Sequence, residues 1–498
     1  MQFTSMAYIL FIALCALAFY VVPKKVQWTV LLVFSYIFYF LAGPKLVVFL
    51  LLTTLTTYFG GIMIEKTEET KVKIGCVLGC LFINFGVLFL LKYLNFSFEV
   101  INSLFNTQIR TINWALPLGI SFYTFQSVGY LLDVYWERTE AEHNLAKHML
   151  FVSFFPQILQ GPISRHKGLS TQLFSYHDFD LTRIEHAAQR IMWGYFLKFV
   201  LADRAGVAVN QVISNYELYD GTVHVFAILM YSIQLYADFS GGMDVVIGTA
   251  ELFGIVLDEN FKRPYFATSL VDFWHRWHIT LGTWMKDYVF YPLSLSPMMM
   301  KLGKKTRKKF GRRTGTAIPV AICNLIVFLV VGIWHGAGGK YLIYGLYNGV
   351  IIAAAELLAP CNRNILTRLG VDIKSTGLRI FRIILTFVVV NISWYFDIPN
   401  DVKSGVYMLK HSFTDFHLST ITDGSLWLLG IGRKDAICLV FGCVVLFAVS
   451  FLKERGLAIR DSIDKRPLVI RWALYFVLVF AVLILGKYSN GGFIYAQF

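Results

Sequence analysis

The sequence contains a series of apolar runs, each close to the length that a helix needs to cross a bilayer. Four of them open the chain, over residues 7–22, 26–42, 46–64 and 74–91. A membrane-spanning helix needs roughly 20 predominantly apolar residues. Because 56% of all residues are apolar and only 15% are charged, the chain has more hydrophobic surface than a soluble protein can bury. These features predict an all-α, multi-pass membrane protein.

Later apolar runs bring the expected number of membrane spans to about twelve. They cover residues 114–132, 191–209, 223–237, 317–334, 341–358, 380–396, 436–452 and 467–485. Two stretches break this pattern. Residues 149–159 are too short to span and end in Gln160-Gly161-Pro162, which predicts a re-entrant or interfacial helix. Residues 238–313 are neither cleanly spanning nor soluble. We assign residues 1–498 to one membrane-embedded domain.

The basic residues fall mainly in the short links between these runs. Lys and Arg exceed Asp and Glu by 45 − 31 = 14. Basic links stay in the cytoplasm, which places both termini and residues 397–434 outside. The excess is typical of an orientation signal and of contact with anionic lipids, and not of nucleic-acid binding. Residues 301–313, with eight Lys or Arg, are expected to be a cytoplasmic loop; the alternative is a docking site for an acidic carrier or nucleotide donor.

One apolar run ends at a histidine, His335, which is followed by Gly336-Ala337-Gly338-Gly339. A histidine in apolar surroundings is costly unless it is paired or lines a polar cavity. Glycine permits positive φ, so we expect the backbone to turn here within the membrane and to leave open space beside the imidazole. The alternative is a structural histidine at a helix end. His335 is therefore a candidate functional residue.

Two further histidines, His275 and His278, lie in a segment that contains three tryptophans. On a helix these two side chains share a face, so metal binding must be considered. No third ligand stands at a suitable spacing, and we expect no metal; an interfacial aromatic and basic helix is the alternative. Imidazole is a general base near neutral pH, and acyl transfer to a hydroxyl requires one. His278 and His335 could therefore serve such chemistry.

Other motifs that would indicate a catalytic or cofactor-binding site are weak or absent in the sequence. The seven cysteines mostly lie in apolar runs and are typical of small core residues. Residues 303–306, Gly-Lys-Lys-Thr, lack the upstream glycine of a phosphate-binding loop, and no G-x-S-x-G motif is present. We therefore expect no bound cofactor.

Six ordered motifs resemble those of the membrane-bound O-acyltransferase family. They are PLGISFYTFQ at 117–126, FPQILQGPI at 155–163, YADFSGG at 236–242, NFKRPY at 260–265, the aromatic and basic segment 273–292, and GIWHGAG at 332–338. They define a motif-bearing core over residues 116–348. More narrowly, the chain resembles the bacterial branch that includes the alginate O-acetylation membrane protein and the D-alanyl transfer protein of teichoic acid synthesis.

The resemblance implies a ring of tilted helices around a central tunnel. There a cytosolic thioester, acyl-CoA or an acyl-carrier protein, would meet an extracytoplasmic hydroxyl. The nearly invariant histidine of the family falls on His335, the expected general base. Its second frequent histidine falls on His278, which would orient or polarise the thioester carbonyl. Residues expected to line the tunnel are Trp334, Gly336, Gly338, Trp274, Trp277, Asp238 and Gln126.

The end of the chain, GGFIYAQF at 491–498, is similar to an aromatic terminal motif of this branch. A phenol ester stays activated, so Tyr495 could relay an acyl group; the alternative is an aromatic anchor at the membrane interface. The sequence departs from the pattern of this branch at two places. Ala496 replaces a common aromatic residue, and residues 391–397 stand where relatives often carry a Phe-Phe-Arg-like segment.

The implied function is transfer of a small acyl group, acetyl, toward an exported polysaccharide or envelope polymer across a bacterial plasma membrane. An extracytoplasmic partner of the SGNH-hydrolase type would complete the transfer. Two alternatives stay open. One is a transporter or flippase for a polymer precursor, and the other is an acyltransferase that acts on a lipid or protein hydroxyl.

Overall fold

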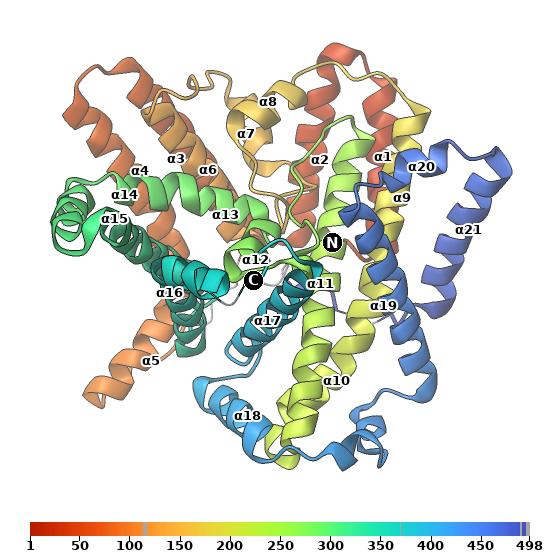
Figure 1. The fold of residues 1–498 in the computed structure, drawn as a ribbon. Helices are drawn as coiled ribbons and strands as arrows, with labels where there is room; N and C mark the ends of the chain where they lie inside the picture. Colours follow the sequence, from red (N-terminus) through yellow and green to blue (C-terminus); the bar gives the residue numbers. More distant parts are fainter. Residues whose placement is uncertain (113–116, 369, 489–490, 495–498) are drawn as a thin grey trace. The chain divides into compact units, whose positions relative to one another are not determined.

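The structure is a computed structural model that describes residues 1–112, 117–368, 370–488 and 491–494 (Figure 1). These residues form helices joined by turns and loops, with a single bridging pair between Phe261 and Trp277. The predicted all-α fold is confirmed for this part of the chain. The predicted span that starts at residue 114 and the core boundary at residue 116 begin outside the described residues.

The contacts of the chain divide it into two compact units. The first unit comprises Met1–Asp203, Leu235–Asp258 and Gly442–Phe498, and the second comprises Arg204–Gln234 and Glu259–Phe441. Three helices contribute residues to both units: α10 (Asp203–Ser214), through Asp203 alone, α11 (Gly221–Leu252) and α19 (Arg433–Glu454).

The first unit contains the N-terminal helices and the last hairpin of the chain. Its helices are α1 (Met6–Val21), α2 (Gln27–Ala42), α3 (Val47–Lys66), α4 (Thr70–Lys92), α5 (Leu94–Phe105), α6 (Ile120–Tyr135), α7 (Leu145–Ser153), α8 (His166–Leu173), α9 (Leu181–Tyr195), the π-helix η3 (Phe196–Ala202), α20 (Ile459–Asp464) and α21 (Leu468–Leu485), with short 3₁₀ turns η1 (Lys24–Val26) and η2 (Pro44–Leu46). Helix α3 packs against α4 and α6. The expected re-entrant helix is shorter and earlier than predicted, because α7 ends at Ser153 and turns follow it.

Helix α11 continues past residue 237, where we expected the span to end. It runs to Leu252, so the motif at residues 236–242 is helical. The glycines of this motif serve a helix crossing: a Cβ on Gly241 would lie 2.7 Å from the carbonyl oxygen of Gly194 on α9, and a Cβ on Gly194 would lie 2.5 Å from that of Gly241. Small residues let two helix backbones approach closely. The predicted span ended too early because the polar and small residues of this motif interrupt the apolar run without ending the helix.

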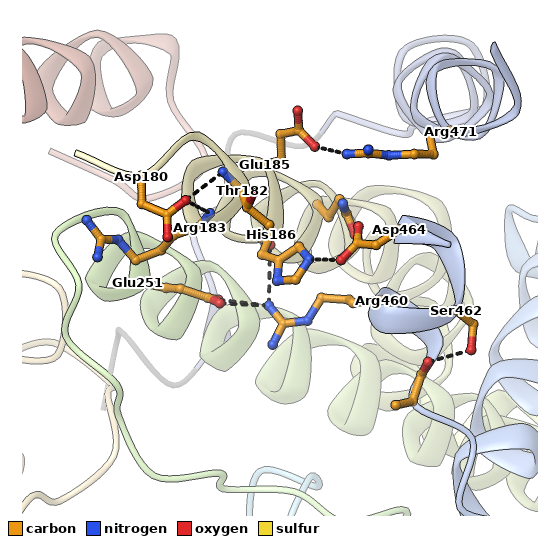
Figure 2. Close-up of polar contacts among 12 residues, drawn as sticks. Asp180, Thr182, Arg183, Glu185, His186, Glu251, Arg460, Ser462, Asp464 and Arg471 are labelled. Carbon is orange, nitrogen blue, oxygen red and sulfur yellow. Dashed lines mark hydrogen bonds and ion pairs between the residues drawn. The ribbon is translucent and has the colours of Figure 1, made fainter. Parts of the chain in front are cut away.

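A network of charged side chains ties the last helices of the first unit to α9 and α11 (Figure 2). His186 Nε2 lies 2.5 Å from Asp464 Oδ2, and Arg460 Nη1 donates to both carboxylate oxygens of Glu251 at 3.0 and 2.9 Å. Arg471 pairs with Glu185. Single partly exposed ion pairs contribute little, but a network of them holds several elements together. These pairs fix α20 and the start of α21 within this unit.

The second unit contains the candidate histidines. Its helices are α10 (Asp203–Ser214), α12 (Leu270–Arg276), α13 (Ile279–Met285), the π-helix η6 (Lys286–Phe290), α14 (Tyr291–Ser294), α15 (Pro297–His335), α16 (Gly339–Arg368), α17 (Thr376–Trp394) and α18 (Val402–Thr414), with 3₁₀ turns η4 (Tyr216–Leu218), η5 (Pro264–Phe266), η7 (Leu418–Ile421) and η8 (Ser425–Leu429).

Helix α15 includes the basic run that we expected to be a loop. Ser296 caps its N-terminus by accepting from the backbone N–H of Met299, and Pro297 follows at the first helical position, where proline is tolerated. The helix kinks sharply at Gly311, where φ is 79°. Its second half then packs along α16, with Gly332 and Gly345 in close backbone contact. This hairpin carries His335 at its turn.

Nine helical segments of the described residues are long and apolar enough to cross a membrane. They are Lys24–Ala42, Pro44–Lys66, Thr70–Lys92, Gly221–Leu252, Pro297–His335, Gly339–Ala359, Thr376–Trp394, Arg433–Glu454 and Leu468–Leu485. The shorter apolar helix Met6–Val21 adds a tenth candidate. The chain is therefore a multi-pass membrane protein.

Candidate active site

His335 is the last residue of α15, where an apolar helix meets a turn. Its side chain is 7% exposed. The backbone leaves the helix at Gly336 with a φ of 173°, which is extended and not left-handed. The expected positive φ is therefore wrong. The glycine is required by packing, because a Cβ there would lie 2.2 Å from Cε2 of Tyr341. An aromatic ring of α16 thus fills the space that we expected to be open.

Aromatic rings surround the His335 imidazole. The ring centroid of Tyr344 lies 5.0 Å from it, and that of Tyr341 lies 6.3 Å away. Tyr344 stacks on Trp394, with centroids 6.1 Å apart, and Trp394 in turn contacts Trp277 at 5.8 Å. These rings form an aromatic wall beside the buried imidazole.

His278 occupies a strained turn between α12 and α13. Its φ is 47°, in the left-handed region, and its side chain is 2% exposed. Asn260 holds this turn, because its Oδ1 accepts from the backbone N–H of Thr280 at 3.0 Å and from the Thr280 hydroxyl at 3.1 Å. The His278 Nδ1 atom lies 3.3 Å from the same oxygen. Strain of this kind is retained where the surroundings fix it.

The two histidines that we predicted to share a helix face do not do so. Helix α12 ends at Arg276, Trp277 is extended, and the chain reverses at His278. His275 is exposed whereas His278 is buried. The metal alternative based on this pair therefore loses its geometric basis.

Trp334 brings His278 and His335 into one site. Its ring contacts the His278 imidazole edge-on, with ring centroids 5.4 Å apart, and also contacts the imidazole of His335, the next residue in the chain. Burial lowers the pKa of His278 well below its ordinary value, and the nearby His335 imidazole lowers it further. His278 is therefore neutral. Since Asn260 Oδ1 already accepts from a backbone N–H, the His278 Nδ1 is the protonated nitrogen, which leaves Nε2 as a hydrogen-bond acceptor.

A carboxylate that the sequence analysis did not select faces His335. Asp397 Oδ1 lies 3.8 Å from His335 Nδ1, and Asp397 is 8% exposed. Its other oxygen, Oδ2, accepts from the hydroxyl of Tyr231 at 2.6 Å. The available signal was an acidic residue placed directly after an apolar span, beside Trp394-Tyr395-Phe396.

The predicted tryptophans join this site. Trp277 is buried and stacks on Phe273, and the Trp274 indole N–H donates to Asn348 Oδ1 at 3.3 Å. Trp274 also contacts Tyr344 with centroids 6.4 Å apart. The structure thus gathers Trp274, Trp277 and Trp334 around the two imidazoles. Gly338 lies in the turn after His335, where a Cβ would make an ordinary contact at 3.7 Å.

Gln126 belongs to the first unit and is part of another network. Its Nε2 donates to the carbonyl of Phe151 at 2.6 Å, and its Oε1 accepts from Gln157 Nε2 at 2.8 Å. Gln157 Oε1 then accepts from the Ser164 hydroxyl at 3.0 Å. These bonds fix the turn after α7 against α6.

Asp238 also belongs to the first unit, where it pairs with a buried lysine. Lys198 Nζ lies 2.7 Å from Asp238 Oδ1 and 2.8 Å from Asp203 Oδ1, and both Lys198 and Asp238 are almost fully buried. The same ammonium donates to the carbonyl of Gly492, and Asp238 Oδ2 accepts from the backbone N–H of Ile494. Asp238 therefore holds the terminal segment. Tyr495 itself lies outside the described residues.

A cavity of about 1010 Å³ lies in the first unit. Its lining mixes acidic and basic side chains, some of which neutralise one another, such as Lys73 and Glu137 at 3.3 Å. In the part of the chain that the structure describes, no three His, Cys, Asp or Glu side chains are gathered as metal ligands.

The fold and this site define a multi-pass membrane protein in which the buried imidazoles of His278 and His335 both contact Trp334 within the second unit. The family model of the membrane-bound O-acyltransferases (MBOAT) matches residues 140–393, about half of the chain, and this range includes both histidines. The chain therefore belongs to the membrane-bound O-acyltransferase family, and it is an O-acyltransferase.

Curated relatives confirm the predicted branch. The chain is 30% identical to the probable alginate O-acetylase AlgI of Pseudomonas syringae pv. tomato, over 82% of this chain and 74% of that protein. It is 29% identical to the peptidoglycan O-acetyltransferase of Helicobacter pylori, over 77% and 72%. It is 28% identical to the teichoic acid D-alanyltransferase of Bacillus subtilis, over 49% and 60%.

Proposed function

We propose that this chain transfers an acetyl group from a cytosolic thioester to a hydroxyl of an exported polysaccharide or other envelope polymer, with His335 as general base. The observation that carries the proposal is the buried His335 imidazole with the Asp397 carboxylate 3.8 Å from its Nδ1. The names of the relatives, which include an alginate O-acetylase and a peptidoglycan O-acetyltransferase, support the acyl group and the acceptor class.

In the proposed reaction, His335 takes the proton from the acceptor hydroxyl as its oxygen attacks the thioester carbonyl. The C–O bond forms, the C–S bond breaks, and the protonated imidazole returns its proton to the leaving sulfur. The aromatic wall keeps water away from the thioester, which limits hydrolysis. Because His278 Nε2 is an acceptor, His278 orients a hydroxyl or amide N–H of a substrate; this tautomer favours the orienting role over polarisation of the carbonyl.

The partners are part of the same proposal. Acyl-CoA or an acyl-carrier protein supplies the thioester from the cytoplasm, and an extracytoplasmic partner of the SGNH-hydrolase type completes transfer to the polymer. Both termini lie outside the plasma membrane. Tyr495 then stands on the outer side as the acyl relay, and the network around Asp238 supports this role because it fixes the preceding residues, Gly492 and Ile494.

Reconstituted protein tests this function against the transporter alternative. Proteoliposomes that carry this chain together with its extracytoplasmic partner of the SGNH-hydrolase type receive acetyl-coenzyme A with radiolabelled acetyl and an alginate or peptidoglycan oligosaccharide. We expect release of free thiol together with labelled ester on the oligosaccharide. Flux of the oligosaccharide into the vesicles without thiol release would instead establish a transporter, and label on lipid would establish a lipid acyltransferase.

A further inference from the structure

Asp397 is held in place by side chains from two other elements. Its carboxylate accepts from Tyr231 on the first part of α11. Its backbone is anchored separately, because Lys340 Nζ at the start of α16 donates to the carbonyls of Asp397 and Pro399 at 2.9 and 2.8 Å. The residue thus has a fixed main chain and a fixed carboxylate, which a merely solvated loop residue would not need.

The two carboxylate oxygens have different neighbours. Oδ2 accepts the Tyr231 hydroxyl at 2.6 Å, which sets the rotation of the carboxylate. Oδ1 then points to His335 Nδ1, 3.8 Å away. This distance is that of an ion pair and not of a hydrogen bond, and the negative charge near Nδ1 favours the tautomer with its proton on that nitrogen, which leaves Nε2 to accept a proton. It also stabilises the imidazolium that forms during general-base catalysis.

We propose that Asp397 is the positioning residue of His335 and that Tyr231 orients its carboxylate. The proposal rests on the proposed role of His335 as the base. These three side chains then act in sequence. The Tyr231 hydroxyl orients the Asp397 carboxylate, this carboxylate orients the His335 imidazole, and the imidazole contacts the substrate. Lys340 fixes the backbone at Asp397 and takes no part in the chemistry.

The Asp397→Asn variant removes the negative charge of this side chain and changes the favoured tautomer of His335 while it leaves the fold intact. An Asn amide oxygen can still accept from Tyr231, and the two bonds from Lys340 go to backbone carbonyls that this substitution leaves unchanged. Its amide N–H₂ would face Nδ1 of His335 and favour the wrong tautomer. The variant should therefore fold, and its defect should be catalytic.

The experiment measures thioester turnover by purified protein together with its extracytoplasmic partner, with acetyl-coenzyme A and an oligosaccharide acceptor. We expect Asp397→Asn to lower kcat by roughly tenfold or more with little change in the KM for the donor. Tyr231→Phe should lower kcat by a smaller factor, and Asp397→Glu should recover part of the loss. In a His335→Ala background, Asp397→Asn should cause no further loss, because residues that act as a unit are not additive.

Two controls separate the outcomes. Asp415→Asn removes a half-exposed carboxylate of the same unit and should leave kcat unchanged. Equal thermal midpoints for Asp397→Asn and wild type would exclude a folding defect. An inactive His335→Ala together with a fully active Asp397→Asn overturns this inference and leaves the proposed function standing. Full turnover by His335→Ala overturns both.

Discussion

The ring of Tyr341 lies where a side chain on Gly336 would stand, and this contact sets how the chain turns after His335. A Cβ on Gly336 would come within 2.2 Å of the ring carbon Cε2 and 2.7 Å of Cδ2. Carbon atoms do not approach so closely without a shift of one group. The position of the His335 imidazole therefore depends on a glycine beside it.

A Gly336→Ala variant should displace either Tyr341 or the end of α15, and we expect acyl transfer to fall by roughly tenfold or more, since a shift of about 1 Å at a reacting group has a large effect on rate. Gly338→Ala is the matched control, because its Cβ would lie 3.7 Å from the same ring. Steady-state kinetics on both variants checks this. Equal rates would show that the turn tolerates a side chain.

Asn260 should matter for the left-handed turn at His278. Its Oδ1 accepts from the N–H and the hydroxyl of Thr280, so Asn260→Ala leaves a buried N–H unsatisfied. We expect a loss of about 1–3 kcal/mol in unfolding free energy and a lower kcat. Thr283→Ala removes a local bond from an exposed residue to the Thr280 carbonyl and should change neither quantity. Thermal unfolding and kinetics of the two variants provide the comparison.

Lys198 should be essential to the stability of the first unit. Its ammonium is 2% exposed and lies between Asp203 and Asp238. Lys198→Met leaves both carboxylates buried without their cation, which typically costs about 3–5 kcal/mol. Lys167→Met, at an exposed position, should be close to neutral. A thermal midpoint for Lys198→Met equal to that of wild type would contradict this.

Two buried histidines of the first unit make its stability depend on pH. Burial lowers the pKa of His148 to about 3 and that of His166 to about 4. The ordinary value is about 6.5, so below that pH the unfolded chain binds protons that the folded chain does not. Stability should therefore fall as pH decreases from 6.5 toward 4, by up to about 1.4 kcal/mol per pH unit for each histidine.

This slope is measured from the thermal midpoints of detergent-solubilised protein between about pH 7 and about pH 4, a range that contains the ordinary histidine pKa. His166→Gln should flatten it, whereas His275→Gln, at an exposed position, should not. A slope that His166→Gln leaves unchanged would assign the acid sensitivity to other groups.

Much of the helical framework could be predicted from the sequence, because the length of an apolar run fixes what can cross a bilayer. The predicted run 26–42 ends where α2 ends, and the predicted run 317–334 ends one residue before the end of α15 at His335. The prediction based on Gly336 was weaker. This glycine serves close packing against Tyr341, and a sequence does not distinguish a glycine that admits a neighbour from one that turns the chain.

The carboxylate at the site was harder to predict. Tyr231 and Asp397 are separated by 166 residues, and no periodicity relates them. Tyr231 has the sequence character of a span residue, and Asp397 that of the first residue of an outer loop. Only the packing of α11, α16 and the loop after α17 within the second unit brings their polar atoms together beside His335.

The central claim is that His335 is the base for acyl transfer to an envelope polymer. The most direct measurement is the amount of ester-linked acetate on envelope polysaccharide from cells that depend on this chain, with His335→Ala compared with wild type at equal protein levels in the membrane. We predict that acetate falls to background while the variant keeps its thermal midpoint. Wild-type acetate levels with His335→Ala would contradict the claim.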